Sequence, residues 1–254
     1  MIRSAGQYRS LVQGKKVYFF DFDGTIFPYT PEFYDHCDDI GTRVAMQLVN
    51  KLSPDVQLSY EEAFQIKKKS LQKYGVSYMA FCELYGMDAT AWHHEYHDNL
   101  DRQLTAPSPL TPEDFQAFPG KVVIFSHADR GWLIDKSKEF GLREVFPDDA
   151  ILAFEDVGYN PKSNGGEAYR EALKKMDVSP DEAVLVDDSL LNHKSAKKAG
   201  LTTVHIGYGK TVSQREHEYV DFSFHAPPEF CGAVKRAEIA LRRQVKPNVL
   251  TFHR

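Results

Sequence analysis

The stretch VYFFDFDGT, residues 17–25, joins an apolar run to two carboxylates, a glycine and a hydroxyl. The run predicts a buried β-strand, in which residues two apart point to the same face. Asp21 and Asp23 would then lie side by side at the end of the strand, where they repel each other and resist desolvation. Such a pair persists when a cation lies beside it or when one acid carries a proton, so the stretch indicates a metal-assisted active site.

A second acidic pair follows another apolar run, because residues 183–186 end at Asp187 and Asp188. If both runs are neighbouring strands of a parallel sheet, their carboxyl ends lie together where open α/β sheets bind ligands. Up to four carboxylates would then face one crevice. All-oxygen ligation of this kind suits Mg²⁺ rather than a soft metal.

Composition and charge exclude several classes of protein. The chain has 254 residues, of which 26% are charged and 42% hydrophobic, as in an ordinary globular protein. A net charge of −5 argues against a general binder of nucleic acids or membrane surfaces. The first 16 residues have no apolar signal region, and three widely spaced cysteines suggest a reducing compartment. We therefore expect a cytoplasmic protein with no nucleic-acid or membrane partner, either a monomer or a homodimer.

The remaining pattern predicts an α/β fold, a Rossmann-like parallel sheet flanked by helices and interrupted by an α-helical cap. Strands alternating with helices indicate βαβ units. The long segment between the first two strands is mostly helical, which suggests a lid over the end of the sheet. The expected domains are a core of residues 1–27 and 115–254 and a cap of residues 28–114. Further strands are expected at 121–125, 150–154, 183–186 and 202–206; core helices at 131–140, 166–176, 190–199 and 229–245; cap helices at 32–52, 59–74, 77–85 and 91–100.

Four elements in order resemble the motifs of the haloacid dehalogenase superfamily. The stretch 21–25 is similar to its first motif, DxDG[T/V]. The other three matches are Ser126 after a strand, Lys162 in a loop, and the pair Asp187-Asp188. The superfamily consists mostly of phosphatases, with fewer mutases, phosphonatases and dehalogenases. Dehalogenases lack the second acid of the first motif, so Asp23 favours phosphoryl transfer.

The resemblance implies a role for each acid. Asp21 would attack phosphorus and form an aspartyl-phosphate, while Asp23 would protonate the leaving oxygen and then activate water. Mg²⁺ would be held by the Asp21 carboxylate, the Asp23 backbone carbonyl and Asp188, with Asp187 bound directly or through water. The expected phosphate-binding residues are Ser126, His127, Lys162 and Thr25.

Parts of the insertion resemble the pyrimidine 5'-nucleotidase subgroup, namely residues 73–77, 84–88 and 93–98, as does 154–159 in the core. This implies a nucleoside monophosphatase whose small phosphorylated substrate is held by cap aromatics and histidines. A phosphatase for a small sugar or other metabolite phosphate is the alternative. A mutase, a phosphate-responsive regulatory module and a phosphonatase stay open; a phosphonatase would need a cap lysine such as Lys67, Lys68, Lys69 or Lys73.

Several residues also have ordinary structural explanations. Ser126 alone would more simply cap the next helix, and Lys162 alone would be a solvated loop lysine. His93 and His97 have the i, i+4 spacing of a metal pair, but without a third ligand these two and His94 are better explained as packing or surface residues.

Overall fold

A six-stranded parallel sheet forms the centre of the protein in the computed structural model, which describes residues 5–245, with side chains for 7–244. The strand order is β3-β2-β1-β4-β5-β6, so β1 lies between β2 and β4. This order places the carboxyl ends of β1 and β4 at the point where the winding of the sheet reverses. The strands are β1 (Val17–Phe20), β2 (Lys121–Phe125), β3 (Ile151–Leu152), β4 (Ala183–Asp187), β5 (Thr202–Ile206) and β6 (Phe222–Phe224).

Alternate residues of β1 pack on opposite faces of the sheet. Tyr18 and Phe20 belong to one apolar cluster, with residues of α5 (Arg130–Glu139) and α8 (Pro227–Val245). Val17 and Phe19 belong to the other, with residues of α6 (Glu167–Met176) and α7 (Leu190–Lys198). Because every residue of β1 is buried, its sequence is continuously apolar, as expected for a central parallel strand.

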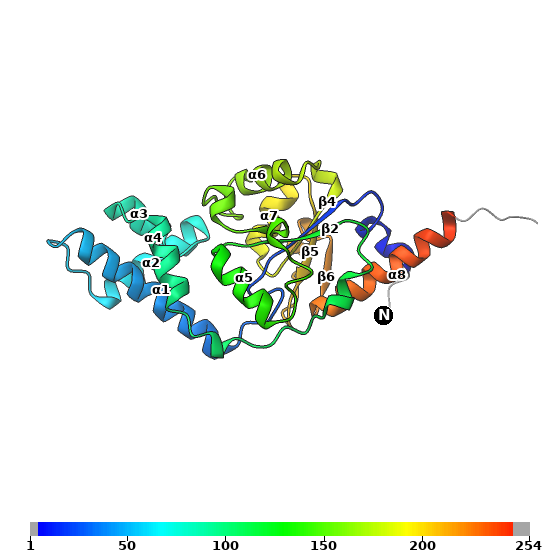
Figure 1. Cartoon of the computed structure of the whole chain (residues 1–254). Coiled ribbons are helices and arrows are strands. Elements are labelled where there is room, and N and C mark those ends of the chain that lie inside the picture. The colour runs from blue at the N-terminus through cyan, green and yellow to red at the C-terminus, as the bar shows by residue number, and fades with distance from the viewer. Residues whose placement is uncertain (1–4, 246–254) are drawn as a thin grey trace, which may run out of the picture.

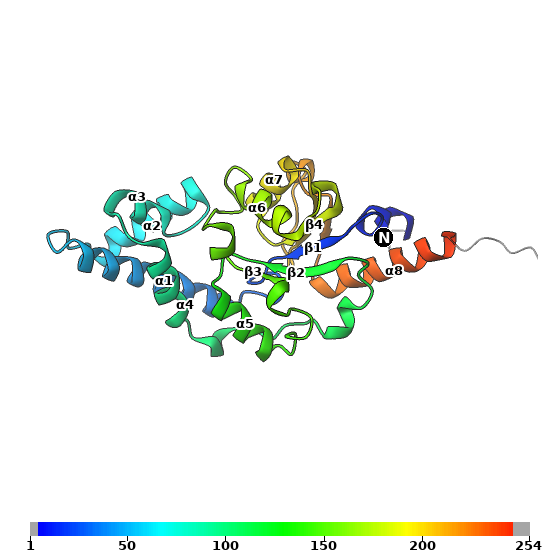
Figure 2. The same cartoon turned by 45° about the horizontal axis from the view of Figure 1, so that its top comes forward.

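The inserted helical cap consists of α1 (Pro31–Leu52), α2 (Tyr60–Tyr74), α3 (Met79–Tyr85) and α4 (Ala89–Asp98). These helices group at one end of the molecule, whereas α8 lies at the other (Figures 1 and 2). Local signals define their ends: Ser59 and Glu62 form a capping box at α2, and Gly75 ends that helix at φ +72°. The chain returns through short 3₁₀ turns at Arg102–Leu104 and Pro112–Phe115.

The predicted strand at 150–154 is largely wrong, because only Ile151–Leu152 pairs with β2. A 3₁₀ turn precedes it, and Phe154 takes helical backbone angles at the start of another turn. Sequence patterns also missed β6, which is only three residues long, and the 3₁₀ helix Ala5–Leu11. The other predicted strands and helices are present within two residues at each end. No helix in residues 5–245 combines the length and the hydropathy required to cross a membrane.

Candidate active site

Asp21 is the first residue after β1, and the sheet holds its backbone in place. Its N–H donates to the carbonyl of Val186 in β4 at 2.8 Å. Its Oδ1 accepts the N–H of Phe22 at 2.8 Å and lies 2.9 Å from Lys162 Nζ. The residue is buried apart from the part that lines a cavity. The pairing of β1 with β4 therefore fixes Asp21 at the carboxyl edge of the sheet.

Lys162 is a fully buried cation between two acids. Its Nζ lies 2.9 Å from Asp21 Oδ1 and 2.8 Å from Asp187 Oδ2, and it donates to the carbonyl of Phe125 at 3.1 Å. Burial acts to lower the pKa of Lys162, but Asp187 and Asp21 outweigh it and raise that pKa. The lysine therefore stays charged and offsets part of the acidic charge around it.

The carboxylate of Asp187 anchors this lysine. Its Oδ1 accepts the N–H of Ser189 at 2.8 Å, and both of its oxygens accept from Asn192 Nδ2 at 3.1 Å. Burial acts to raise the pKa of Asp187, yet Lys162, His193 and the hydrogen bond from Ser189 together outweigh it, so the pKa is lowered. Asn192 thus binds Asp187 without adding charge.

Asp23 has a different partner, Trp132 in α5. The indole Nε1–H donates to Asp23 Oδ1 at 3.0 Å. Burial raises the pKa of Asp23 to about 6, although the hydrogen bond from Trp132 acts in the opposite direction. A carboxyl group with this pKa can give up or accept a proton near neutral pH.

The acids fit a divalent cation. Asp21, Asp187 and Asp188 each offer an oxygen, and these oxygens lie within 4.8 Å of one another. Burial and then Asp187 raise the pKa of Asp188 to about 7, and burial raises the pKa of Asp21 well above its ordinary value. Burial is the main cause of both shifts, and the neighbouring acids add to it. Gly24, at φ +79°, leaves room beside them, because a Cβ there would lie 2.7 Å from Asp188 Oδ2. The oxygen-only donor set suits Mg²⁺.

Ser126 and His127 follow β2 and line the same cavity as Asp21. Ser126 Oγ accepts the N–H of Ala128 at 3.2 Å, so it does not cap α5. His127 Nε2 accepts the backbone N–H of Lys162 at 2.8 Å. Burial lowers the pKa of His127 to about 3, which keeps its ring neutral. Its side chain thus holds the loop that carries the lysine.

Thr25 is fully buried and does not line this cavity. Within residues 5–245 its Oγ1 has no hydrogen-bond partner, while its carbonyl accepts from Tyr208 at 3.0 Å. Lys162 also lies behind the cavity wall and reaches it through Asp21. The structure therefore brings the predicted site residues into one region, but it places these two and the fully buried Asp187 outside the cavity surface.

The cavity has a volume of about 350 Å³ and lies between the cap helices and the carboxyl edge of the sheet. At its cap side, Lys67 of α2 is buried and its Nζ lies 2.6 Å from Asp38 Oδ1. This pairing neutralises the one lysine that lines the cavity among the described residues. The other feature of the wall is its aromatic rings, which belong to Tyr29, Phe33, Tyr34, Tyr78, Trp92, Tyr96, Trp132 and Phe154.

Two polar side chains of the cap wall lack hydrogen-bond partners among the residues that the structure describes. They are His93, at both ring nitrogens, and Tyr78, at its hydroxyl. Burial lowers the pKa of His93 to about 2, so its neutral ring offers one donor and one acceptor. His97 instead donates from Nδ1 to the carbonyl of His93 at 2.7 Å, and His94 is exposed.

Sequence patterns missed Trp132, which is the hydrogen-bond partner of Asp23. No spacing rule connects residues so far apart in the chain. One signal could have pointed to Trp132: it lies in the first turn of the helix that follows β2, and this turn is near the carboxyl edge of the sheet, where the acids lie.

A sequence model described as haloacid dehalogenase-like hydrolase matches residues 15–200. A search of curated proteins finds no match. Similar solved structures include a protein from Bacteroides vulgatus named as a proposed β-phosphoglucomutase, with a TM-score of 0.58 and 18% identity over 94% of this chain and 100% of that one. L-2-haloacid dehalogenase from Xanthobacter autotrophicus has a TM-score of 0.51 and 15% identity over 87% and 98% of the two chains. A proposed hydrolase from Bacillus subtilis, bound to magnesium, has a TM-score of 0.50 and 15% identity over 87% and 98%. At these identities the likeness concerns the fold.

Proposed function

The chain belongs to the haloacid dehalogenase-like hydrolase family, and we propose that it is a Mg²⁺-dependent phosphomonoester hydrolase that works through an aspartyl-phosphate on Asp21. The observation that carries this proposal is the pair of acids after β1. Asp21 is held by Lys162 at 2.9 Å, whereas Asp23, two residues on, is held by Trp132 at 3.0 Å. The two carboxylates therefore have different environments, as a nucleophile and an acid–base group require.

Asp21 must be ionised to attack phosphorus. Burial raises its pKa, and Lys162 acts in the opposite direction. Asp21, Asp187 and Asp188 would hold Mg²⁺, which supplies positive charge that offsets both the acids and the phosphoryl oxygens. Attack forms the bond from an Asp21 oxygen to phosphorus and breaks the ester P–O bond.

Asp23 would act at the leaving oxygen. With its pKa raised to about 6, a fraction of Asp23 carries a proton near neutral pH, and this proton passes to the oxygen as the ester bond breaks. The resulting carboxylate then accepts a proton from the water that attacks the phosphoryl group. Ser126 lines the cavity and would bind a phosphoryl oxygen.

The cap side of the cavity favours an uncharged, flat leaving group. Lys67 is paired with Asp38, so no unpaired lysine of the described cavity wall would bind a second phosphate. The His93 ring nitrogens and the Tyr78 hydroxyl have unused donors and acceptors among the aromatic rings beside the cavity; these atoms are covered here, so a ligand would reach them after a small shift of the cap side chains. A nucleobase pairs with such groups and stacks on such rings, which supports a nucleoside monophosphate as the substrate.

A phosphate-release assay with Mg²⁺ tests the proposal across nucleoside monophosphates, nucleoside diphosphates, sugar monophosphates and sugar bisphosphates. We expect the highest kcat/KM for a nucleoside monophosphate and the lowest for substrates with a second phosphate. No phosphate release from any ester would contradict the proposed hydrolase activity. A clear preference for sugar phosphates would contradict only the proposed nucleotide substrate.

The variant His93→Phe tests the cap wall, with the exposed neighbour His94→Phe as its matched control. We expect His93→Phe to raise the KM for the preferred nucleotide by about tenfold, the effect of one or two lost hydrogen bonds. The kcat for p-nitrophenyl phosphate, which has no base, should change by less than about threefold. Equal effects of the two variants on KM would argue against a base-binding role for His93.

One observation also favours a second candidate, a phosphonatase. Lys67 lines the cavity, and burial lowers its pKa although Asp38 acts in the opposite direction. A phosphonatase uses such an amine to form a Schiff base with its carbonyl substrate. Borohydride trapping with phosphonoacetaldehyde, followed by peptide mass analysis, would detect a covalent adduct on Lys67, and absence of the adduct would exclude this candidate.

A further inference from the structure

We propose that Trp132 is a positioning residue for Asp23, and that it links the orientation of this carboxyl group to the placement of the cap. The inference rests on the proposed function, because it assigns Asp23 the transfer of a proton to the leaving oxygen. It concerns a residue outside the four sequence motifs.

The indole N–H provides the direct contact. Trp132 Nε1 donates to Asp23 Oδ1 at 3.0 Å, and the tryptophan side chain is almost fully buried. This bond leaves Oδ2 of Asp23 available for the proton. A carboxyl group next to a flexible glycine, Gly24 at φ +79°, gains a fixed orientation from such a donor.

The same ring contacts both ends of the cap. Phe33, in the first turn of α1, is stacked on Trp132 with ring centroids 6.2 Å apart and an interplanar angle of 4°. His97, in the last turn of α4, has its ring centroid 5.9 Å away. Asp129 adds a third connection, because its Oδ1 accepts the backbone N–H of Trp132 at 2.7 Å and its Oδ2 lies 3.3 Å from His97 Nδ1.

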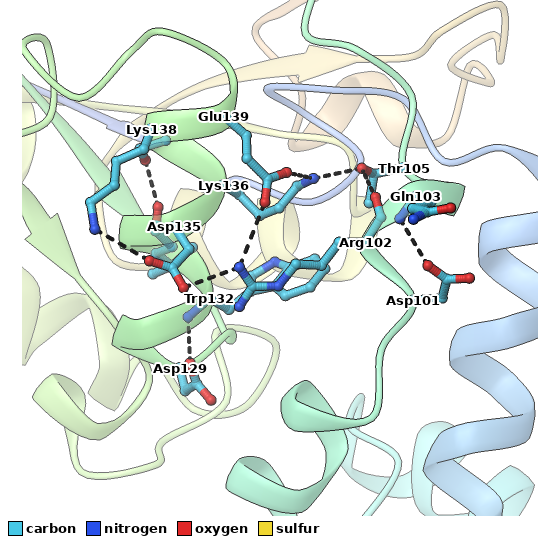
Figure 3. Close-up of polar contacts among 12 residues, drawn as sticks. Asp101, Arg102, Gln103, Thr105, Asp129, Trp132, Asp135, Lys136, Lys138 and Glu139 are labelled. Atoms are coloured by element: carbon cyan, nitrogen blue, oxygen red, sulfur yellow. Dashed lines mark hydrogen bonds and ion pairs between the residues drawn. The ribbon is translucent and has the colours of Figure 1, made fainter.

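The segment that leads from the cap back to the core is also tied to α5 around this ring (Figure 3). The guanidinium of Arg102 lies 5.8 Å from the centre of the Trp132 ring and bonds Asp135 at 3.1 Å. Lys136 is almost fully buried and donates to Thr105 Oγ1 at 2.6 Å. Trp132 is therefore enclosed by α1, α4 and the returning segment, while its N–H reaches Asp23.

This arrangement makes the position of Asp23 depend on the cap. If the cap shifts relative to α5, Phe33 and Arg102 no longer hold the indole in the same place. The proton of Asp23 is then no longer aimed at the leaving oxygen. Removing the N–H should therefore affect the step that needs the proton, in which the ester P–O bond breaks and the leaving oxygen becomes a hydroxyl.

The test compares kcat/KM for esters whose leaving groups differ in their need for a proton. A purely structural role of Trp132 would change kcat/KM for both kinds of ester equally. p-Nitrophenyl phosphate releases a stable anion that needs little protonation, whereas an alkyl phosphate releases an alkoxide that needs the proton. In Trp132→Phe, which keeps the stacking on Phe33, we expect kcat/KM to fall by about tenfold or more for alkyl phosphates, the range of a lost hydrogen bond to a charged group. The fall for p-nitrophenyl phosphate should stay below about threefold.

The matched control is Trp92→Phe, which removes another indole N–H from the cavity wall, one that donates to the carbonyl of Gly41. It should change kcat/KM for both substrate classes by the same factor. Equal losses on both classes in Trp132→Phe would overturn the positioning role while leaving the hydrolase intact. A wild-type protein inactive on every ester would instead overturn the proposed function.

The half-exposed Arg102 provides a second variant that does not disturb the core. Arg102→Gln should loosen the returning segment. We expect a smaller fall in kcat/KM than in Trp132→Phe, and this fall should be greater for alkyl phosphates than for p-nitrophenyl phosphate. An unchanged ratio between the two substrates in Arg102→Gln would overturn the link to the cap. Circular dichroism and melting temperature verify that each variant is folded.

Discussion

At the scale of single residues, four acids gather at one sheet edge and differ because their partners differ. Asp187 shares a buried salt bridge with Lys162, and its pKa is lowered. Burial raises the pKa of Asp23 to about 6 and that of Asp188 to about 7. The chemistry proposed for each acid therefore follows from its neighbours and not from residue type.

The variant Asp21→Asn should lose turnover by roughly a thousandfold or more, because an amide does not replace the nucleophile. The side chain keeps its shape, so the melting temperature should stay within a few degrees of the wild type. Phosphate release and calorimetry measure the two effects. The control is Asp55→Asn, an exposed acid between α1 and α2 that should keep full activity. A folded Asp21→Asn protein with near wild-type turnover would refute the nucleophile assignment.

The pKa of Asp188, raised first by burial and then by Asp187 to about 7, predicts a pH effect on stability without metal. Because the folded-state pKa of Asp188 lies above its unfolded value, its contribution to stability is fully present below the ordinary carboxyl pKa and is lost as pH rises through about 7. In EDTA the melting temperature should therefore fall between about pH 4 and pH 7. Asp188→Asn should flatten this fall, and an equally steep fall in the variant would contradict the assignment.

At the scale of elements, the start of α5 shows how local signals place the site. Ser126 was predicted to bind phosphate, and taken alone it would have been a cap for this helix; Asp129 is the cap, because it accepts the N–H of Trp132 at 2.7 Å. Ser126 is left on the cavity surface. The short loop after β2 therefore supplies both the cap of α5 and the Ser126 hydroxyl on the cavity surface. The first turn of α5 that follows it carries Trp132, whose indole N–H donates to Asp23.

Removing the cap with Asp129→Ala should lower the free energy of unfolding by about 1 to 2 kcal/mol, the usual cost of losing an acidic N-cap. Asp129→Asn keeps a capping oxygen and should lose less than half as much. Urea denaturation measures both. If the two variants lost the same amount, the negative charge near His97 would be the stabilising feature in place of the cap.

At the scale of the whole molecule, the strand order brings together segments that are far apart in the chain. β1 pairs with β4, so the acids at 21 and 23 meet those at 187 and 188 at one edge. The cap helices, inserted between β1 and β2, complete the cavity over that edge. The active-site candidate therefore exists only when core and cap are folded together.

Mg²⁺ should raise the melting temperature of the metal-free protein at pH 8, because it binds the folded acids and not the unfolded chain. At a free Mg²⁺ concentration of about 100 times Kd, the free energy of unfolding should rise by about 2.7 kcal/mol. Scanning calorimetry with added Mg²⁺ measures the gain, and EDTA should abolish turnover reversibly. Asp188→Asn should reduce the gain, and an undiminished gain would place the metal elsewhere.

Local patterns in the sequence were enough to predict most strands, most helices and the acidic clusters, because these depend on apolar runs, capping residues and acids at the ends of strands. Asp21, Asp23, Lys162, Asp187 and Asp188 could thus be proposed together from motif order alone. The tertiary structure decided which partner each one has. The hydrogen bonds of Trp132 to Asp23 and of the Lys162 backbone to His127 join residues that are distant in the chain. No periodicity encodes such contacts, since they arise only when the sheet order and the cap bring separate elements into one place.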